Sequence, residues 1–185
     1  VTMSSPFDYE YETIRVAEVA PRVAHLQLNR RGDLNAITET MLVELSDAVD
    51  ALGRNDEVQV LVLSGSGTRA FSVGAAVRGR LEHLDMETAV DLSRRGQRAF
   101  ARVRRFPGPV IASIEGYCLG GGVGLAAGAG LRHPGPRVAV GAPGLPLRPV
   151  PGGGGAPRLR GLIRPGGGVG GRSPARRRGR PRYRP

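Results

Sequence analysis

Three consecutive glycines at positions 120–122 separate an apolar run, residues 110–114, from a stretch of small residues that ends at Ala129. Glycine lets the backbone come close to a ligand, and the first N–H groups of a helix have no partner within that helix. Such N–H groups favour a ligand atom that carries negative charge. The order of strand, glycine turn and helix therefore predicts a site where backbone N–H groups at this turn approach a ligand closely. The alternative is that the glycines only make a tight turn.

The elements that must hold this turn are predicted from the apolar pattern. Residues 38–52 carry apolar side chains at helical spacing, with Thr38 as a cap and Gly53 as an end signal. Residues 58–63 form a nearly continuous apolar run, which is typical of a strand buried on both faces. The other predicted elements are strands at 22–28 and 110–114, a short extended piece at 71–76, and helices at 86–103 and from residue 122. Strands and helices alternate, so the sequence predicts an α/β fold.

The composition changes sharply after residue 115. All 16 acidic residues precede Gly116, every basic residue is an arginine, and the net charge of the 185-residue chain is +11. From residue 130 on, Gly, Pro, Arg and Ala dominate, and such a composition buries too little apolar area to offset the entropy of ordering. We predict one domain over residues 1–164, degraded over 130–164, and a disordered basic low-complexity tail over 165–185.

Cysteine, histidine and apolar residues exclude several classes of protein. Cys118 is the only cysteine, so no internal disulfide forms and we expect a cytoplasmic protein. The three histidines show no metal-ligand spacing, so we expect no metal site. The sequence has no apolar run of membrane-spanning length and no secretory signal, so we expect no membrane partner.

Four segments, in order, resemble the motifs of the enoyl-CoA hydratase/isomerase (crotonase) family. They are NRRGDLNAI at 29–37, AFSVGAA at 70–76, PVIASIEGYCLGGGVGLA at 109–126 and VPGGGGAPRL at 150–159. Arg31 stands where the family has proline, and Ala76 stands where it has aspartate. The chain thus resembles a C-terminally truncated or degraded member. This resemblance implies an α/β fold of repeated ββα units, with an incomplete C-terminal part rich in Gly, Pro and Arg.

The resemblance also implies a ligand. Family members hold a fatty acyl-CoA thioester with its carbonyl oxygen against two backbone N–H groups, which stabilise the enolate. The matching donors are Ala75 and Gly121. The other matching substrate-binding positions are Asp33, Leu34, Gly74, Ala76 and Gly120. Coenzyme A enters as part of the substrate, so no separate cofactor is implied. Family members form homo-trimers or hexamers, an assembly that missing C-terminal helices would weaken here.

The catalytic carboxylates of the family's hydratases have no counterpart in this chain. Those hydratases use two glutamates, and the matching positions are Gly124, two residues after the triplet, and Gly144, at the end of GAPG. Glycine transfers no proton, so the sequence predicts an acyl-CoA-binding protein with little or no hydratase activity. The alternative is a non-enzymatic acyl-CoA-binding protein or a decayed remnant.

Three further patterns have alternative interpretations. Residues 122–127 match a dinucleotide-binding turn, but no acidic residue follows to bind a ribose, which disfavours that interpretation. The arginines of residues 172–184 either bind phosphate backbones or form a solvated tail, and the second is favoured, so nucleic acid is not an expected partner. The arginines of residues 94–105 either attract the phosphates of coenzyme A or form a solvated helix face.

Overall fold

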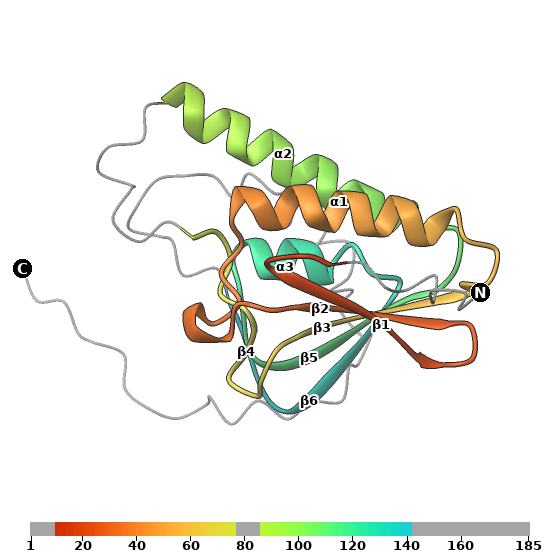
Figure 1. The fold of residues 1–185 in the computed structure, drawn as a ribbon. Coiled ribbons are helices and arrows are strands. Elements are labelled where there is room, and N and C mark those ends of the chain that lie inside the picture. Colours follow the sequence, from red (N-terminus) through yellow and green to blue (C-terminus); the bar gives the residue numbers. More distant parts are fainter. Residues whose placement is uncertain (1–9, 77–85, 142–185) are drawn as a thin grey trace, which may run out of the picture.

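The computed structural model describes residues 10–76 and 86–141. The sequence predictions for the end of the domain (residues 142–164), for the tail (165–185) and for Gly144 concern residues outside this part of the chain. Along the chain, helices separate groups of one or two strands (Figure 1). In chain order they are β1 (Ile14–Ala20), β2 (Val23–Leu28), the 3-10 helix η1 (Arg31–Asp33), α1 (Glu39–Gly53), β3 (Val60–Gly65), β4 (Ala70–Ser72), α2 (Met86–Arg104), β5 (Val110–Leu119), α3 (Gly121–Ala126) and β6 (Leu131–Gly141). Two strands followed by a helix occur twice, as β1-β2-α1 and β3-β4-α2.

The strands form one sheet with the order β1-β2-β3-β5-β4, and β6 also pairs with β5. Only β1 and β2 are antiparallel; the other strand pairs in the described residues are parallel. The first half of β5 pairs with β3, where Val110 lies opposite Leu61, and its second half pairs with β4, where Cys118 lies opposite Ser72. Parallel strands end at the same edge of a sheet, so β4 and β5 bring the residues that follow them to one edge.

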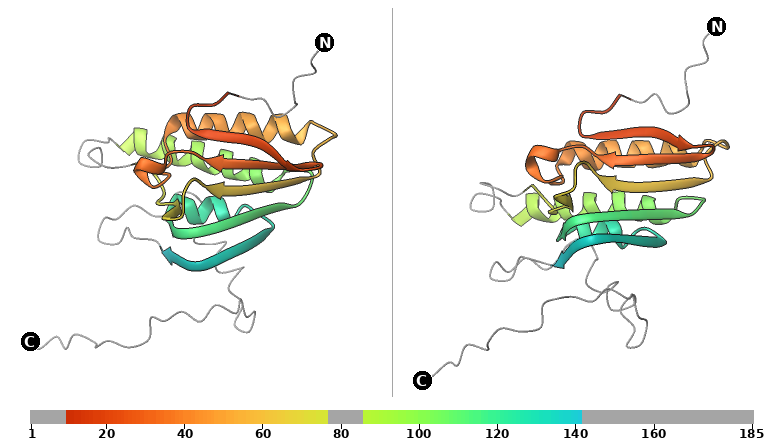
Figure 2. Two further views of the ribbon diagram at one scale, coloured as in Figure 1. Left: turned by 60° about the horizontal axis from the view of Figure 1, so that its bottom comes forward. Right: turned by 90° about the horizontal axis from the view of Figure 1, so that it is seen from below.

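The core lies between the sheet and the helices. In Figures 1 and 2, α1 and α2 lie side by side across one face of the sheet. The apolar stripe of α1 is buried, and α2 contributes Ala99, Phe100 and Val103. These side chains pack with one face of the sheet, where Leu26, Leu61 and Ala112 are fully buried. No helix in the described part of the chain is long and apolar enough to span a membrane.

The predicted helices and strands are present, with some differences in extent and burial. α1 begins after Thr38, whose Oγ1 accepts a hydrogen bond from the N–H of Met41 (3.1 Å), and it ends at Gly53 as predicted. The prediction that residues 58–63 are buried on both faces is wrong, because Leu61 and Leu63 are buried whereas Val62 is only half-buried. Val90, at 40% exposed, also does not face the core.

Two strands, β1 and β6, are absent from the sequence prediction. The side chains of β1 after Ile14 are mostly exposed, and β6 contains Pro134, Gly135 and Pro136, so neither shows a strand pattern of its own. Both are formed by pairing, β1 with β2 and β6 with β5. Tertiary pairing therefore decides these two elements against a weak local preference.

Candidate functional site

Two glycine turns meet at the edge where β4 and β5 end. Gly74 follows β4, and Gly120 and Gly121 follow β5 at the start of α3. A Cβ atom on Gly74 would lie 2.8 Å from the nitrogen of Gly121 and 2.8 Å from the carbonyl oxygen of Leu119. Gly74 also has φ +86°, where other residues are strained, so both its conformation and its close approach require glycine. The two turns are therefore in direct backbone contact.

The N–H groups of Ala75 and Gly121 lie on neighbouring segments of this contact. A methyl group placed on Gly121 would be 3.6 Å from the nitrogen of Ala75. Ile37 forms a bridge with Ala75 by donating to the carbonyl oxygen of Gly74 (2.8 Å) and accepting from the N–H of Ala76 (2.9 Å). In a parallel bridge with this pattern, the N–H of Ala75 itself points away from Ile37. Among the described residues, no acceptor is bonded to the N–H of Ala75 or of Gly121.

A buried polar network fixes the Gly74 turn from behind. The Ser72 hydroxyl donates to the backbone carbonyl of Asn35 (2.8 Å) and accepts from the N–H of Gly74 (3.1 Å). The Asn35 side chain donates to the carbonyls of Ser66 (3.1 Å) and Ala70 (2.8 Å), on either side of the loop before β4. Ser72 is fully buried and Asn35 is 1% exposed, so water does not compete for these bonds.

Sequence reasoning missed Asn35 and Ser72, although both lie inside segments that were matched to the family. Asn35 adopts a left-handed conformation (φ +55°) and is followed by two buried apolar residues, Ala36 and Ile37. Asparagine tolerates this conformation better than most residues. The sequence itself carries no signal that distinguishes this buried amide or the buried Ser72 hydroxyl from exposed ones.

The other predicted substrate-binding positions lie around the same turns. Leu34 accepts a hydrogen bond from the N–H of Val73 (3.2 Å), which places it beside the chain that leads to Gly74. Ala76 and Gly120 are exposed, next to the two candidate donors. Asp33 is also exposed, and its carboxylate forms an ion pair with Arg30. The structure thus brings Leu34, Gly74, Ala76 and Gly120 close to the candidate site, while Asp33 is engaged by a neighbour.

In the part of the chain that the structure describes, no polar side chain near the glycine triplet is placed as an evident proton carrier. Gly124 is buried in α3, and Gly144 lies outside the described residues. Glu115 lies against β6, where its carboxylate occupies the space that a Cβ on Gly135 would fill. Burial raises the pKa of the Cys118 thiol to about 12, so this group stays protonated at neutral pH. In the described part of the chain, no group of three His, Cys, Asp or Glu residues is placed to hold a metal ion.

This edge of the sheet therefore carries two candidate backbone donors on neighbouring segments. Two N–H groups from separate turns are free of partners within the described residues, and a rigid buried network fixes one of the turns. Preorganised backbone donors of this kind stabilise charge that develops on a carbonyl oxygen.

Comparison with known proteins assigns the family. Residues 23–160 match the family model described as enoyl-CoA hydratase/isomerase. The chain belongs to the enoyl-CoA hydratase/isomerase family, and its mixed α/β architecture is that of the crotonase fold. An enoyl-CoA hydratase of known structure from Bacillus anthracis superposes with a TM-score of 0.78 at 30% sequence identity, over 82% of this chain and 58% of that one.

Two curated relatives show the range of activities among similar proteins. The crotonyl-CoA hydratase of Syntrophomonas wolfei is 34% identical over 156 residues, which cover 84% of this chain and 59% of the relative. The human mitochondrial Delta(3,5)-Delta(2,4)-dienoyl-CoA isomerase is 29% identical over 143 residues, which cover 72% of this chain and 43% of the relative. The chain therefore spans about half the length of the curated relatives it matches.

Proposed function

We propose that this protein binds the thioester group of an acyl-CoA, with the carbonyl oxygen between the N–H groups of Ala75 and Gly121. Two observations together carry the proposal: the two glycine turns are in backbone contact, and both N–H groups lack a partner among the described residues. The names of the relatives, a crotonyl-CoA hydratase and a dienoyl-CoA isomerase, support an enoyl-CoA as the ligand.

The proposed activity stops short of efficient hydration. Two backbone donors polarise a carbonyl and stabilise an enolate, but the addition of water also needs a group that moves a proton. Gly124 supplies none, and Gly144 supplies none either. The function we propose is acyl-CoA binding with carbonyl polarisation, in which any hydratase turnover is residual.

The substitution Gly121→Ala tests the oxygen site. The added methyl group would lie 3.4 Å from Cδ1 of Ile37 and 3.6 Å from the nitrogen of Ala75, so it fits the fold but fills the space between the two donors. Loss of a hydrogen bond to a polarised carbonyl corresponds to about a tenfold weaker affinity for crotonyl-CoA. Isothermal titration calorimetry with the full chain measures this affinity.

Gly130→Ala is the matched control. A methyl group on Gly130 lies 3.7 Å from the carbonyl oxygen of Val110, an ordinary contact away from both donors. We expect this variant to bind crotonyl-CoA as the unchanged protein does. Equal binding by the Gly121→Ala and Gly130→Ala variants would contradict the proposed oxygen site, as would absence of binding by the unchanged chain.

A further inference from the structure

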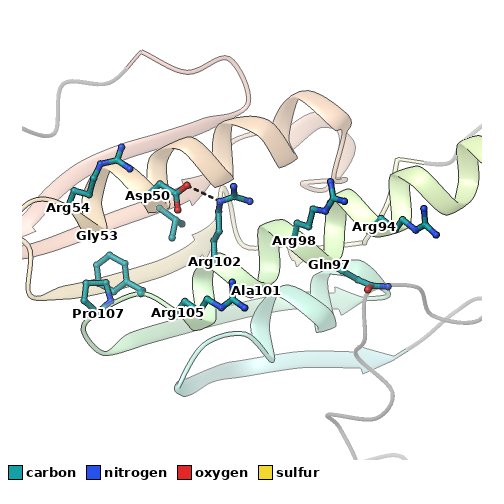
Figure 3. A pocket seen from close by; sticks show the side chains of 12 residues that line it. Asp50, Gly53, Arg54, Arg94, Gln97, Arg98, Ala101, Arg102, Arg105 and Pro107 are labelled. Carbon is teal, nitrogen blue, oxygen red and sulfur yellow. Dashed lines mark hydrogen bonds and ion pairs between the residues drawn. The ribbon is translucent and has the colours of Figure 1, made fainter.

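A groove lies between the second half of α1 and the middle and end of α2. Its cavity volume is about 800 Å³, within the range of small-molecule sites. Arginine side chains from α2 and from the residues that follow α1 and α2 line it, as Figure 3 shows. They are Arg54, which follows α1, and Arg94, Arg98, Arg102 and Arg105, from α2 and the residue after it. We refer to this feature as the arginine groove.

The positive charge of the arginine groove is largely uncompensated. Asp50 is the one carboxylate among the described residues of its lining, and it accepts a hydrogen bond from Nε of Arg102 (2.8 Å; Figure 3). The other four arginines have no carboxylate within ion-pair distance among the described residues. Elsewhere on α2, Arg95 pairs with Asp91 at 2.6 Å, so the same helix neutralises charge outside the groove.

The spacing of these arginines is unfavourable for a helix without a ligand. Arg94, Arg98 and Arg102 follow one another at intervals of four residues, so like charges are neighbours on one helix face. Such pairs destabilise a helix by about as much as opposite charges stabilise it. An anion that lies across these side chains removes the repulsion, and a guanidinium group binds phosphate oxygens in a bidentate manner.

The arginine groove is separate from the oxygen site. The lining residues of α1 begin at Val49, whereas the oxygen site contacts Ile37, two residues before α1. The stretch of α1 from Glu39 to Val49 alone corresponds to roughly 15 Å along the helix axis. No residue of the groove lining belongs to the two glycine turns, so a ligand of the groove is recognised independently.

We propose that the arginine groove binds an anion that carries several phosphate groups in a row. Arg94, Arg98 and Arg102 are displaced by about 6 Å per step along α2, which arranges the guanidinium groups in a line rather than around a point. A linear series of phosphates matches this line better than a single small anion does. At one end, Phe106 and Pro107 add an apolar surface beside the charged row.

The triple variant Arg94→Gln, Arg98→Gln, Arg105→Gln removes three of these charges and keeps the Asp50–Arg102 bond. Its control is Arg15→Gln, Arg95→Gln, Arg104→Gln, which removes the same charge from three exposed positions outside the groove lining. Tripolyphosphate, titrated by calorimetry, and a fluorescent single-stranded oligonucleotide, followed by anisotropy, are the probes. The full chain is used throughout, so the arginines of residues 172–184 are present in every sample.

The triple variant of the groove arginines should bind tripolyphosphate, the oligonucleotide or both at least about tenfold more weakly than the control variant does. If the oligonucleotide is the ligand, the slope of log affinity against log salt should also become shallower by about 2, at 0.7 per phosphate contact. A loss with tripolyphosphate alone assigns a soluble ligand, and a loss with the oligonucleotide alone assigns a nucleic-acid strand. Equal affinities of the two variants for both probes, or no binding by the unchanged protein, would overturn the proposal.

The result is independent of the proposed acyl-CoA function. The Gly121→Ala variant alters only the oxygen site, so it should bind tripolyphosphate and the oligonucleotide as the unchanged protein does. A failure of crotonyl-CoA binding therefore leaves the test of the arginine groove intact.

Discussion

His25 is a half-buried residue of β2 whose ring lies among neutral partners. Its Nε2 atom is 2.8 Å from the hydroxyl of Ser64 on the adjacent strand, β3. Burial lowers the pKa of His25 below its ordinary value of 6.5, because the charged imidazolium loses contact with water. The folded state therefore favours the neutral ring more strongly than the unfolded state does.

This difference predicts a pH dependence of stability. Below pH 6.5 the unfolded state takes up a proton at this histidine before the folded state does, so the free energy of unfolding falls as the pH falls through the lowered pKa. Above pH 6.5 the contribution is constant. The variant His25→Gln lacks the titrating ring, so its stability should fall less steeply over the same range. Urea unfolding at a series of pH values measures both slopes, and identical slopes would refute the explanation.

Residue chemistry explains which parts of the site follow from the sequence. The sequence identifies the glycines at 74, 120 and 121 because they lie in motifs that resemble those of the family. Their backbone contact is compatible with the predicted role of residues 75 and 121 as donors, and that role stays a prediction. The Asn35–Ser72 network was not predicted, since a buried amide and a buried hydroxyl look the same in a sequence as exposed ones. Burial is a property of the packed structure and not of the residue type.

Among the elements, α1 allows a direct test of whether a residue at a helix end stabilises that helix. Thr38 caps the helix by accepting the N–H of Met41, which has no partner within the helix. We expect Thr38→Ala to lower the free energy of unfolding by about 1 kcal/mol. Urea unfolding provides the measurement. Thr40→Ala, at an exposed position in the first turn of the same helix, should leave stability unchanged within about 0.5 kcal/mol.

The elements that sequence predicts are those whose preferences are local. The apolar stripe of α1 and the apolar runs of β3 and β5 show where these three elements lie in the sequence. Thr38 and Gly53 mark the two ends of α1. β6 was missed because its prolines and glycine are typical of a turn, and it becomes a strand only by pairing with β5. The meeting of residues 74 and 121 likewise depends on the parallel register of β4 and β5, which no local pattern specifies.

For the whole molecule, the family assignment and the proposed lack of catalytic carboxylates lead to opposite expectations of activity. The chain belongs to a family whose named relatives include a crotonyl-CoA hydratase, whereas the sequence resemblance predicts that the glycines at 124 and 144 stand at the two glutamate positions. General acid–base catalysis contributes about 10²- to 10⁴-fold to a rate. We therefore predict that the purified chain hydrates crotonyl-CoA at least about 100-fold more slowly than the Syntrophomonas wolfei hydratase assayed alongside.

The double variant Gly124→Glu, Gly144→Glu extends this measurement. It restores both carboxylates by sequence, so its rate should exceed that of the unchanged chain if the oxygen site is in place. The loss of absorbance of the conjugated thioester follows the reaction. Turnover by the unchanged chain at the rate of the relative would show that other groups carry the proton.

The position of β6 has a consequence for how the molecule behaves at high concentration. Within the described residues β6 pairs with β5 and with no other strand, so an added strand from a second molecule would have to bind along the other margin of β6. Pro134 and Pro136 lack the N–H groups that such a strand would need, and Arg132 and Arg137 place like charges on both sides of them. The prolines that give the β6 sequence the appearance of a turn therefore also hinder the addition of strands from other molecules.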